Sequence, residues 1–171
     1  WITADFETQG EPYGQAWARC YQKSVDGGTS TTFHDLCDGL GPTVTVAKLS
    51  TGKLVGGYAG VSWASSGHST SSPTNFLFSL TNGFRHALKD GWKGSAQYHS
   101  YRGPTFGGGH DLHIQYNMNG GMCDPGDTYA CRVGRHESPT CRSDFCGARN
   151  GWTINELEVW YHAPPTASPS V

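Results

Sequence analysis

The chain has 171 residues, the size of one ordinary domain, and its formal net charge at pH 7 is −2. This balance excludes the strongly basic face that a nucleic-acid-binding domain carries, and we expect no nucleic-acid partner. The apolar stretches are a few residues long, far below the roughly 20 that a membrane-spanning helix needs, so we expect no membrane insertion. The 24 glycines disfavour long helices, while six Trp, eight Tyr and seven Phe can build a folded core.

The N-terminal part of the chain predicts an arm followed by a helix. Residues 1–16 contain Gly and Pro breakers and are expected to form an irregular arm. Residues 16–21 predict a short strand or a turn of helix. Residues 30–40 predict a short helix, because a Ser/Thr cap precedes apolar residues spaced by three and four and Gly-Pro follows them.

Strand patterns dominate the rest of the chain. Residues 43–49 and 54–63 predict a hairpin, residues 75–80 a strand buried on both faces, residues 111–116 an alternating strand and residues 153–162 the last strand. These elements indicate a mainly β (α+β) fold, a sandwich of two antiparallel sheets with a few short flanking helices.

We expect one domain over residues 17–162 and a flexible C-terminal tail over residues 163–171. Residues 117–151 show little periodicity and predict a long, cysteine-bearing loop. The chain begins at Trp1 rather than at a methionine, from which we expect that a preceding segment was removed.

The cysteine count predicts the redox compartment. The six cysteines are Cys20, Cys37, Cys123, Cys131, Cys141 and Cys146. Their spacing does not match paired zinc knuckles, so we expect three disulfides and a secreted, extracellular protein. The first pair is expected to be Cys20–Cys37, which flanks the predicted helix, and the other four cysteines can pair in three ways. No N-glycosylation sequon occurs.

Polar residues alternate with apolar ones on the predicted strand 111–116. Period two places Leu112, Ile114 and Tyr116 on one face and Asp111, His113 and Gln115 on the other. The polar row could bind hydroxyl groups, or it could simply be a solvated face. His110 and His113 would point to opposite faces of a strand, so we expect no metal site there.

Glu156 and Glu158 share one face of the last predicted strand. Paired carboxylates are what a glycosidase uses, but a pair of structural acids on a strand is the more economical interpretation. Motifs for a serine nucleophile, a zinc protease or a phosphate-binding loop are absent from the sequence. We therefore expect a protein without catalytic activity and without a cofactor.

The aromatic residues fall into two groups. One group lies in patterned segments and is expected in the core: Trp17, Trp63, Phe76, Phe78, Phe106, Trp152 and Trp160. The other group lies in loops rich in Gly or Ser, where a ring beside amides and hydroxyls suits a sugar: Trp1, Trp92, Tyr98, Tyr101 and Tyr129. The candidate ligand-binding residues bracket the glycine-rich turn 103–109: Trp92, Tyr98, Tyr101, His110, Asp111 and His113.

Seven segments together resemble a known domain in their order along the chain. They are residues 33–38 (FHDLCD), 41–46 (GPTVTV), 55–58 (VGGY), 62–63 (SW), 76–80 (FLFSL), 103–112 (GPTFGGGHDL) and 155–160 (NELEVW). This order resembles the TLDc domain over about residues 17–161. The resemblance implies a two-sheet sandwich and a non-catalytic role, and it matches the family's helix to residues 33–38 and its final-strand acids to Glu156 and Glu158.

The resemblance also implies a role to be weighed against carbohydrate binding. Intracellular TLDc proteins are linked to oxidative-stress resistance and to binding of the vacuolar proton pump. The six cysteines and the segment 117–151 depart from that pattern. We therefore expect a lectin-type module that binds glycans or glycoproteins, with a stress-protective or pump-binding protein as the alternative and a hydrolase as the third. A homo-oligomer is left open.

Overall fold

The computed structural model describes residues 17–90, 95–97, 102–108, 110–133 and 138–162. The predicted arm (1–16) and tail (163–171) lie outside these ranges. The elements in chain order are β1 (Trp17–Gln22), α2 (Lys23–Asp26), α3 (Ser30–Cys37), β2 (Thr43–Leu49), β3 (Leu54–Ala59), β4 (Ser69–Ser71), β5 (Phe76–Ser79), β6 (Phe84–His86), β7 (Ser95–Gln97), β8 (Thr105–Phe106), β9 (Leu112–Ile114), β10 (Gly121–Met122), α4 (Pro139–Phe145) and β11 (Ile154–His162).

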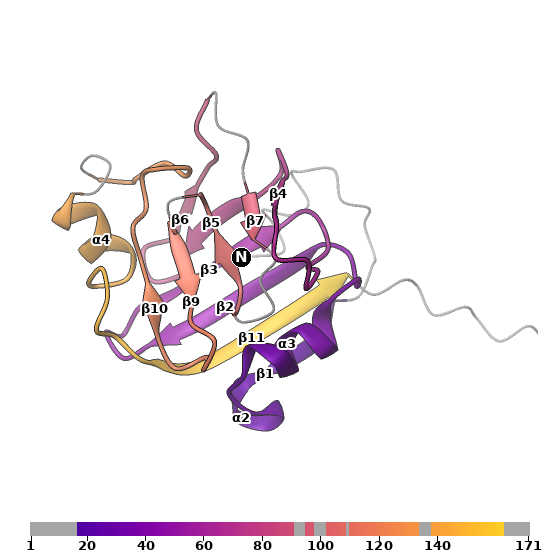
Figure 1. Ribbon diagram of the computed structural model, residues 1–171. Helices are drawn as coiled ribbons and strands as arrows, with labels where there is room; N and C mark the ends of the chain where they lie inside the picture. The colour runs from indigo at the N-terminus through magenta and orange to yellow at the C-terminus, as the bar shows by residue number, and fades with distance from the viewer. Residues whose placement is uncertain (1–16, 91–94, 98–101, 109, 134–137, 163–171) are drawn as a thin grey trace, which may run out of the picture.

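The strands form two antiparallel sheets that pack face to face (Figure 1). The larger sheet has the order β1-β11-β2-β3-β5-β6 and the smaller one β10-β9-β8-β7-β4. In Figure 1 the smaller sheet lies in front of β2 and β11, with α3 beside β1 and α4 at the other side of the molecule. The predicted mainly β sandwich with short flanking helices is confirmed.

The core between the sheets contains a row of aromatic rings in contact. Phe33 from α3 packs edge-on against Trp63, and Trp63 packs edge-on against Phe106 from β8, with ring centroids 5.7 and 5.5 Å apart. The indole N–H of Trp63 donates to the hydroxyl of Thr43 at 2.7 Å, so its one polar atom is satisfied in the interior.

The glycine pair of β3 allows this close packing. A Cβ added at Gly57 would lie 2.7 Å from the ring of Phe106, which reaches across from the smaller sheet. Any larger residue at position 57 would push the two sheets apart locally.

A second apolar cluster forms separately from the core between the sheets. It consists of Val44, Tyr58, Phe76 and Phe78, with Trp17 and Trp160 packed against it in half-buried positions. The aromatic residues expected in the core are therefore buried or half-buried in one of the two clusters.

The predicted helix is observed but is shorter than expected. Thr29 caps it by accepting from the backbone N–H of Thr32 at 3.1 Å. The helix ends at Cys37, because Asp38 is extended and forms a bridge with Trp63. Cys37 is bonded to Cys20 of β1, as predicted, and this disulfide fastens α3 to the edge of the larger sheet.

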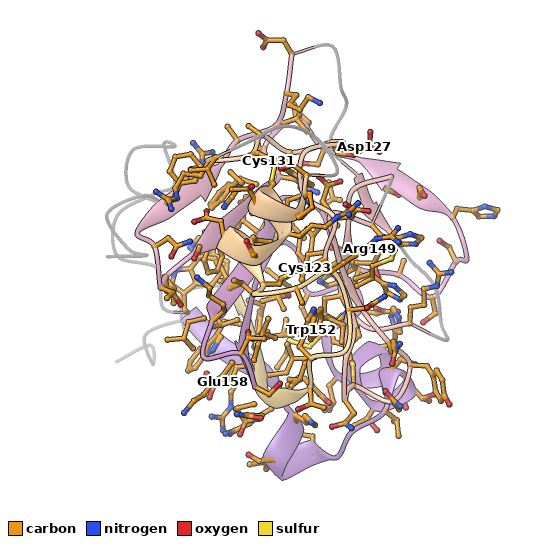
Figure 2. The ribbon with its side chains drawn as sticks, turned by 90° about the vertical axis from the view of Figure 1, so that its left-hand side faces the viewer. Cys123, Asp127, Cys131, Arg149, Trp152 and Glu158 are labelled. Carbon is orange, nitrogen blue, oxygen red and sulfur yellow. A yellow bond between two sulfur atoms is a disulfide. The ribbon has the colours of Figure 1, made fainter. Side chains whose placement is uncertain are left out.

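The segment predicted as a long loop contains β10 and α4. Ser138 caps α4 by accepting from the backbone N–H of Cys141 at 3.0 Å. The disulfides are Cys123–Cys146 and Cys131–Cys141, so the four clustered cysteines pair among themselves as predicted. Figure 2 shows Cys123 and Cys131 on the side of the molecule where α4 lies.

The helices of the described ranges are short, and none has the length and apolarity that crossing a bilayer requires.

Candidate functional site

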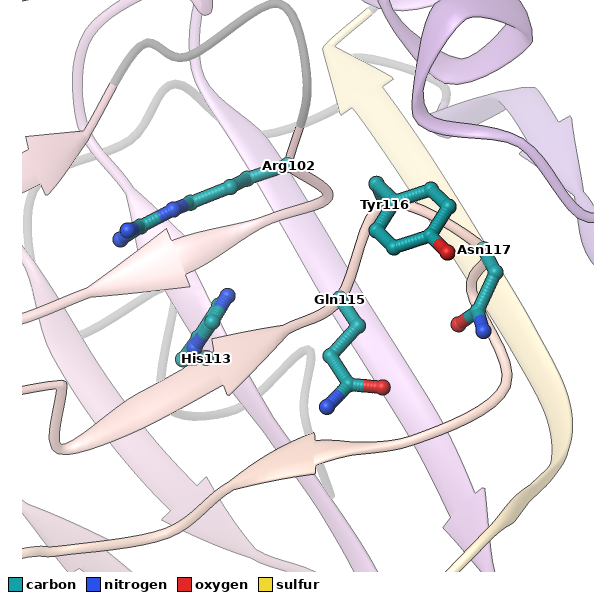
Figure 3. Close-up of a pocket in the computed structure, with 5 residues that line it drawn as sticks. All are labelled: Arg102, His113, Gln115, Tyr116 and Asn117. Carbon is teal, nitrogen blue, oxygen red and sulfur yellow. The ribbon is translucent and has the colours of Figure 1, made fainter.

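A surface pocket of about 260 Å³ lies where β9 runs into the following turn (Figure 3). Its lining residues are Arg102, His113, Gln115, Tyr116 and Asn117. His113 belongs to β9, Arg102 precedes β8, and the other three residues form the turn. The pocket thus contains His113 from the predicted site and Gln115 from the polar row of the predicted strand, together with Arg102, Tyr116 and Asn117, which were not predicted as ligand-binding.

Backbone hydrogen bonds hold the turn in place. The N–H of Gln115 donates to the carbonyl of Gly120 at 2.9 Å, and the N–H of Met118 donates to the carbonyl of Gln115 at 3.0 Å. The carbonyl of Tyr116 accepts from the N–H of Ser30, the first residue of α3, at 2.8 Å. Met118 is fully buried, so its side chain anchors the turn in the core.

The side chain of Tyr116 is 65% exposed although its backbone is fixed. Alternation had placed Tyr116 on the apolar face with Leu112 and Ile114, and this expectation is wrong. β9 ends at Ile114, so the period of two stops there and the turn directs Tyr116 to solvent. Asn117 and Gly120, which are residue types typical of turns, could have indicated that the strand ends before Tyr116.

Two histidines lie close together beside the pocket. The ring centroids of His110 and His113 are 4.9 Å apart, which corrects the expectation that they point to opposite faces. His110 precedes β9 and has a positive φ of 65°, so strand alternation does not apply to it. In the described part of the chain, no group of three His, Cys, Asp or Glu side chains is arranged to hold a metal ion.

Arg102 contacts His110 directly. The guanidinium Nη1 lies 2.6 Å from the Nε2 atom of His110. Because a guanidinium only donates, Nε2 accepts and the imidazole in this contact is neutral.

The main chain of Arg102 is held by His34. The carbonyl of Arg102 accepts from Nε2 of His34 at 3.1 Å, and the Nδ1 atom of His34 lies 2.8 Å from Asp38. His34 therefore links α3 to the main chain of the pocket.

Asp111 lies in the interior and not on the pocket surface. Its carboxylate accepts from the backbone N–H groups of Gly126, Thr128 and Tyr129 at 3.0 to 3.2 Å. Burial raises the pKa of Asp111 to about 6, although these hydrogen bonds act in the opposite direction. Gly107 makes room for the carboxylate, because a Cβ there would lie 2.1 Å from an Asp111 oxygen.

Four loop aromatics that were predicted to suit a sugar remain to be placed, and the structure describes one of them. Trp92, Tyr98 and Tyr101 lie outside the described residues. Tyr129, which was expected at the surface of a loop, is fully buried.

The two acids of β11 each have partners within the fold. Glu156 accepts from the backbone N–H of Ser24 at 3.1 Å and from the amide of Gln22 at 3.3 Å. Burial tends to raise the pKa of Glu156, but these hydrogen bonds outweigh it and the pKa is lowered. Glu158 accepts from the indole N–H of Trp160 at 3.0 Å. A glycosidase acid needs a raised pKa, whereas that of Glu156 is lowered.

The cysteine-bearing segment carries its own ionic cluster. The buried carboxylate of Asp124 accepts from Nε of Arg142 at 2.6 Å and from Nε of Arg149 at 3.0 Å. These bonds join α4 to the chain on either side of it. We interpret this cluster as structural, because both arginines pair with the buried carboxylate and so compensate its charge in the interior.

Comparison with known families agrees with the two-sheet fold and with the order of its motifs. A family model described as the TLDc domain matches residues 6–162. The chain belongs to the TLDc family. The TLDc match extends from before β1 to the end of β11, so it includes the pocket and residues 6–16 of the predicted N-terminal arm. No curated protein matches the chain.

Proposed function

We propose that this TLDc domain is a non-catalytic recognition module that binds carbohydrate in the pocket around Tyr116. The observation that carries the proposal is an exposed phenol ring flanked by two amide side chains, Gln115 and Asn117. A sugar has apolar C–H faces that pack on an aromatic ring and hydroxyl groups at its rim that pair with amides. The lining of this pocket offers both kinds of contact.

The rigidity of the turn also supports binding. The hydrogen bonds of Gln115, Tyr116 and Met118 fix the backbone before any ligand arrives. A site ordered in advance loses less conformational entropy on binding, so weak contacts with hydroxyl groups can still give a measurable affinity. Recognition residues on a loop held by a rigid scaffold are also the common arrangement.

The three disulfides are consistent with an extracellular protein. Disulfides are rare in cytosolic proteins, where thiols are kept reduced. This favours a secreted glycan-binding protein over the stress-protective or pump-binding role of intracellular TLDc proteins. Glycans and glycoproteins are therefore the proposed partners, and the hydrogen bonds of Glu156 and Glu158 give no support to the hydrolase alternative.

The test compares two truncations of exposed side chains. Tyr116→Ala removes the proposed stacking ring, whereas Leu54→Ala shortens an exposed residue of β3 in the other sheet. On a glycan array followed by calorimetry, we expect Tyr116→Ala to weaken binding about tenfold or more and Leu54→Ala to leave it unchanged. Melting curves of both variants check that the fold is intact. Equal glycan binding by the wild type and Tyr116→Ala would overturn the proposal.

A further inference from the structure

We propose that residues 6–16 of the predicted N-terminal arm dock across the outer face of the larger sheet, on the second apolar cluster. The outer face is the one turned away from the smaller sheet. The pocket around Tyr116 lies at the turn after β9, a strand of the smaller sheet, so the proposal does not depend on glycan binding. The occupant of this aromatic face is thus a segment of the same chain.

The cluster forms a row that crosses the strands of the larger sheet. Trp160 of β11 is paired with Val44 of β2, and Val44 is paired with Tyr58 of β3. Tyr58 is paired in turn with Phe76 of β5, and their rings stack with centroids 5.2 Å apart. Trp17 of β1 packs against the same cluster. The row therefore begins at the strand that the arm joins.

This row is buried, although the described residues supply no second layer over it. Val44, Tyr58 and Phe76 expose only 3% to 5% of their surface within the single chain. Every described apolar residue that packs in the cluster belongs to the larger sheet or, for Leu80, directly follows β5. Trp17, Tyr58 and Phe76 also take part in interactions beyond these pairings. The burial points to a cover contributed by residues outside the described ranges.

Two segments outside those ranges begin beside the row. The arm precedes Trp17 of β1 and the tail follows His162 of β11, and these two residues are paired, with ring centroids 5.2 Å apart. The internal segments that the structure does not describe lie next to β7, β9 or α4 in the sequence, and none of these elements belongs to the larger sheet. The arm and the tail are therefore the candidates for the cover.

The composition of the two segments favours the arm. It carries the rings of Phe6 and Tyr13, whereas the tail, residues 163–171, contains only Ala, Pro, Thr, Ser and Val. Aromatic side chains bury large areas against one another, so the arm suits an aromatic row better. The TLDc match also begins at residue 6 and ends at residue 162, so it includes residues 6–16 and excludes the tail.

The length of the arm is sufficient to cross the sheet. The larger sheet has six strands, and neighbouring strands lie about 4.8 Å apart, so its width is about 24 Å. Residues 6–16 in an extended conformation span about 36 Å. The arm can therefore reach from β1 to the opposite edge strand, β6.

The charge of the arm complements the far end of the row. Arg85 of β6 places its guanidinium over the ring of Phe76, 4.2 Å from the ring centroid. Residues 1–16 include Asp5, Glu7 and Glu11 but no lysine or arginine. An acidic segment that crosses the sheet thus approaches a cation, and this attraction adds to the apolar contact.

The experiment measures how fast hydroxyl radicals oxidise individual rings, because this rate reports the exposure of each ring to solvent. In the intact, disulfide-bonded chain, the double substitution Phe6→Ser with Tyr13→Ser removes the two arm rings that contact the row. We expect the oxidation rates of Tyr58 and Phe76 to rise severalfold in this variant. Peptide mass spectrometry assigns the oxidation to single residues.

The matched control is the double substitution Pro165→Ser with Val171→Ser, which removes two apolar side chains from the tail. It should leave the rings of the row as protected as in the wild type. Two other rings serve as internal standards. Tyr116 is exposed and should oxidise rapidly in every variant, whereas the buried Trp63 should oxidise only if a variant unfolds.

A second measurement needs no variant. In the wild type, nuclear Overhauser effects should connect ring protons of Phe6 or Tyr13 with those of Trp17, Tyr58 or Phe76. A mixture of labelled and unlabelled chains shows whether these contacts are made within one chain or between two.

Three outcomes would overturn the proposal. The first is unchanged protection of Tyr58 and Phe76 in a folded arm variant, and the second is loss of that protection in the tail variant instead. The third is the absence of Overhauser effects between the arm and the row within one chain, which decides the question even if the arm variant unfolds. Contacts found only between chains would assign the face to a second copy. Glycan binding tests the proposed function alone.

Discussion

Asp111 is a carboxylate that the fold places in its interior, facing the backbone amides of Gly126, Thr128 and Tyr129. These amides belong to the segment between Cys123 and Cys131, each of which forms a disulfide. Asp111, which directly precedes β9, therefore connects this strand to that segment, and it can affect ligand binding only indirectly, by stabilising the fold. We propose that the amides of Gln115 and Asn117, and not Asp111, pair with the hydroxyl groups of the ligand.

The titration of Asp111 gives a prediction for stability. Its pKa is raised from 3.8 to about 6 in the folded protein, so between these values the folded state binds more protons than the unfolded state. The contribution of Asp111 to the free energy of unfolding therefore falls as the pH rises through this window, by roughly 3 kcal/mol in all. Urea denaturation of the wild type and Asp111→Asn, at several pH values, should show this fall only in the wild type.

The same experiment has a direct spectroscopic check. The carboxyl carbon of Asp111 should titrate with a midpoint near pH 6 in an NMR pH series. A midpoint below 4, or identical pH profiles of stability for the wild type and Asp111→Asn, would contradict this description of the site.

Individual site residues were predictable only in part. The alternation of residues 111–116 identified His113, which lines the pocket. It missed Tyr116, because the alternation of buried and exposed residues was assumed to continue to residue 116, whereas β9 ends at Ile114. The contact between Arg102 and His110 and the burial of Asp111 depend on residues that are 8 to 18 positions apart in sequence. Short-range periodicity carries no information about such contacts.

At the scale of elements, the approach of the two sheets depends on β3 and β8. Gly57 of β3 faces the ring of Phe106, with no room for a Cβ between them. Gly108, in contrast, is exposed, has ordinary backbone geometry and would meet nothing within 4 Å. These two glycines therefore form a matched pair for testing the packing of the sheets.

We expect Gly57→Ala to lower the free energy of unfolding by about 1–3 kcal/mol, because an added methyl group overpacks the core. Gly108→Ala should change it by less than about 0.5 kcal/mol. Chemical denaturation at constant pH measures both values. A Gly57→Ala variant as stable as the wild type would show that the sheets are not packed as described.

The elements with strong local signals were predicted and the others were not. α3 and the hairpin β2–β3 follow from a cap, apolar spacing and alternation within the segment itself. α4 was missed, although Ser138 and Pro139 form a helix start and Cys141 and Phe145 share one face. The strand patterns indicated a sandwich, and the TLDc resemblance agreed with it. The strand order was not predicted, because the pairing of β11 with β2 joins residues about a hundred positions apart.

At the scale of the whole molecule, two disulfides fasten a segment with little regular structure, and the third joins a helix to a strand. Cys123–Cys146 and Cys131–Cys141 close loops within one segment, and Cys20–Cys37 joins α3 to β1. We expect peptide mapping without reductant to recover these three pairs. Reduction should lower the melting temperature markedly, since each bridge contributes about 2–4 kcal/mol. Thiols that can be alkylated in the unreduced protein would contradict the pairing.

Ligand binding is expected to be independent of metal ions. The lining residues of the pocket include no carboxylate, and in the described part of the chain no group of three His, Cys, Asp or Glu side chains is arranged to hold a metal ion. Dialysis against EDTA should therefore leave the affinity for glycans unchanged. Loss of binding that calcium restores would show that oxygen ligands elsewhere in the chain form a site.

We propose that the turn after β9 is where this TLDc domain contacts its ligand. The most direct test is to titrate an isotope-labelled sample with the tightest-binding glycan and to follow the NMR signals of each residue. We predict the largest shifts at the five lining residues, Arg102, His113, Gln115, Tyr116 and Asn117. Shifts confined to residues 92–101 or 118–151, with Tyr116 and Asn117 unaffected, would contradict it.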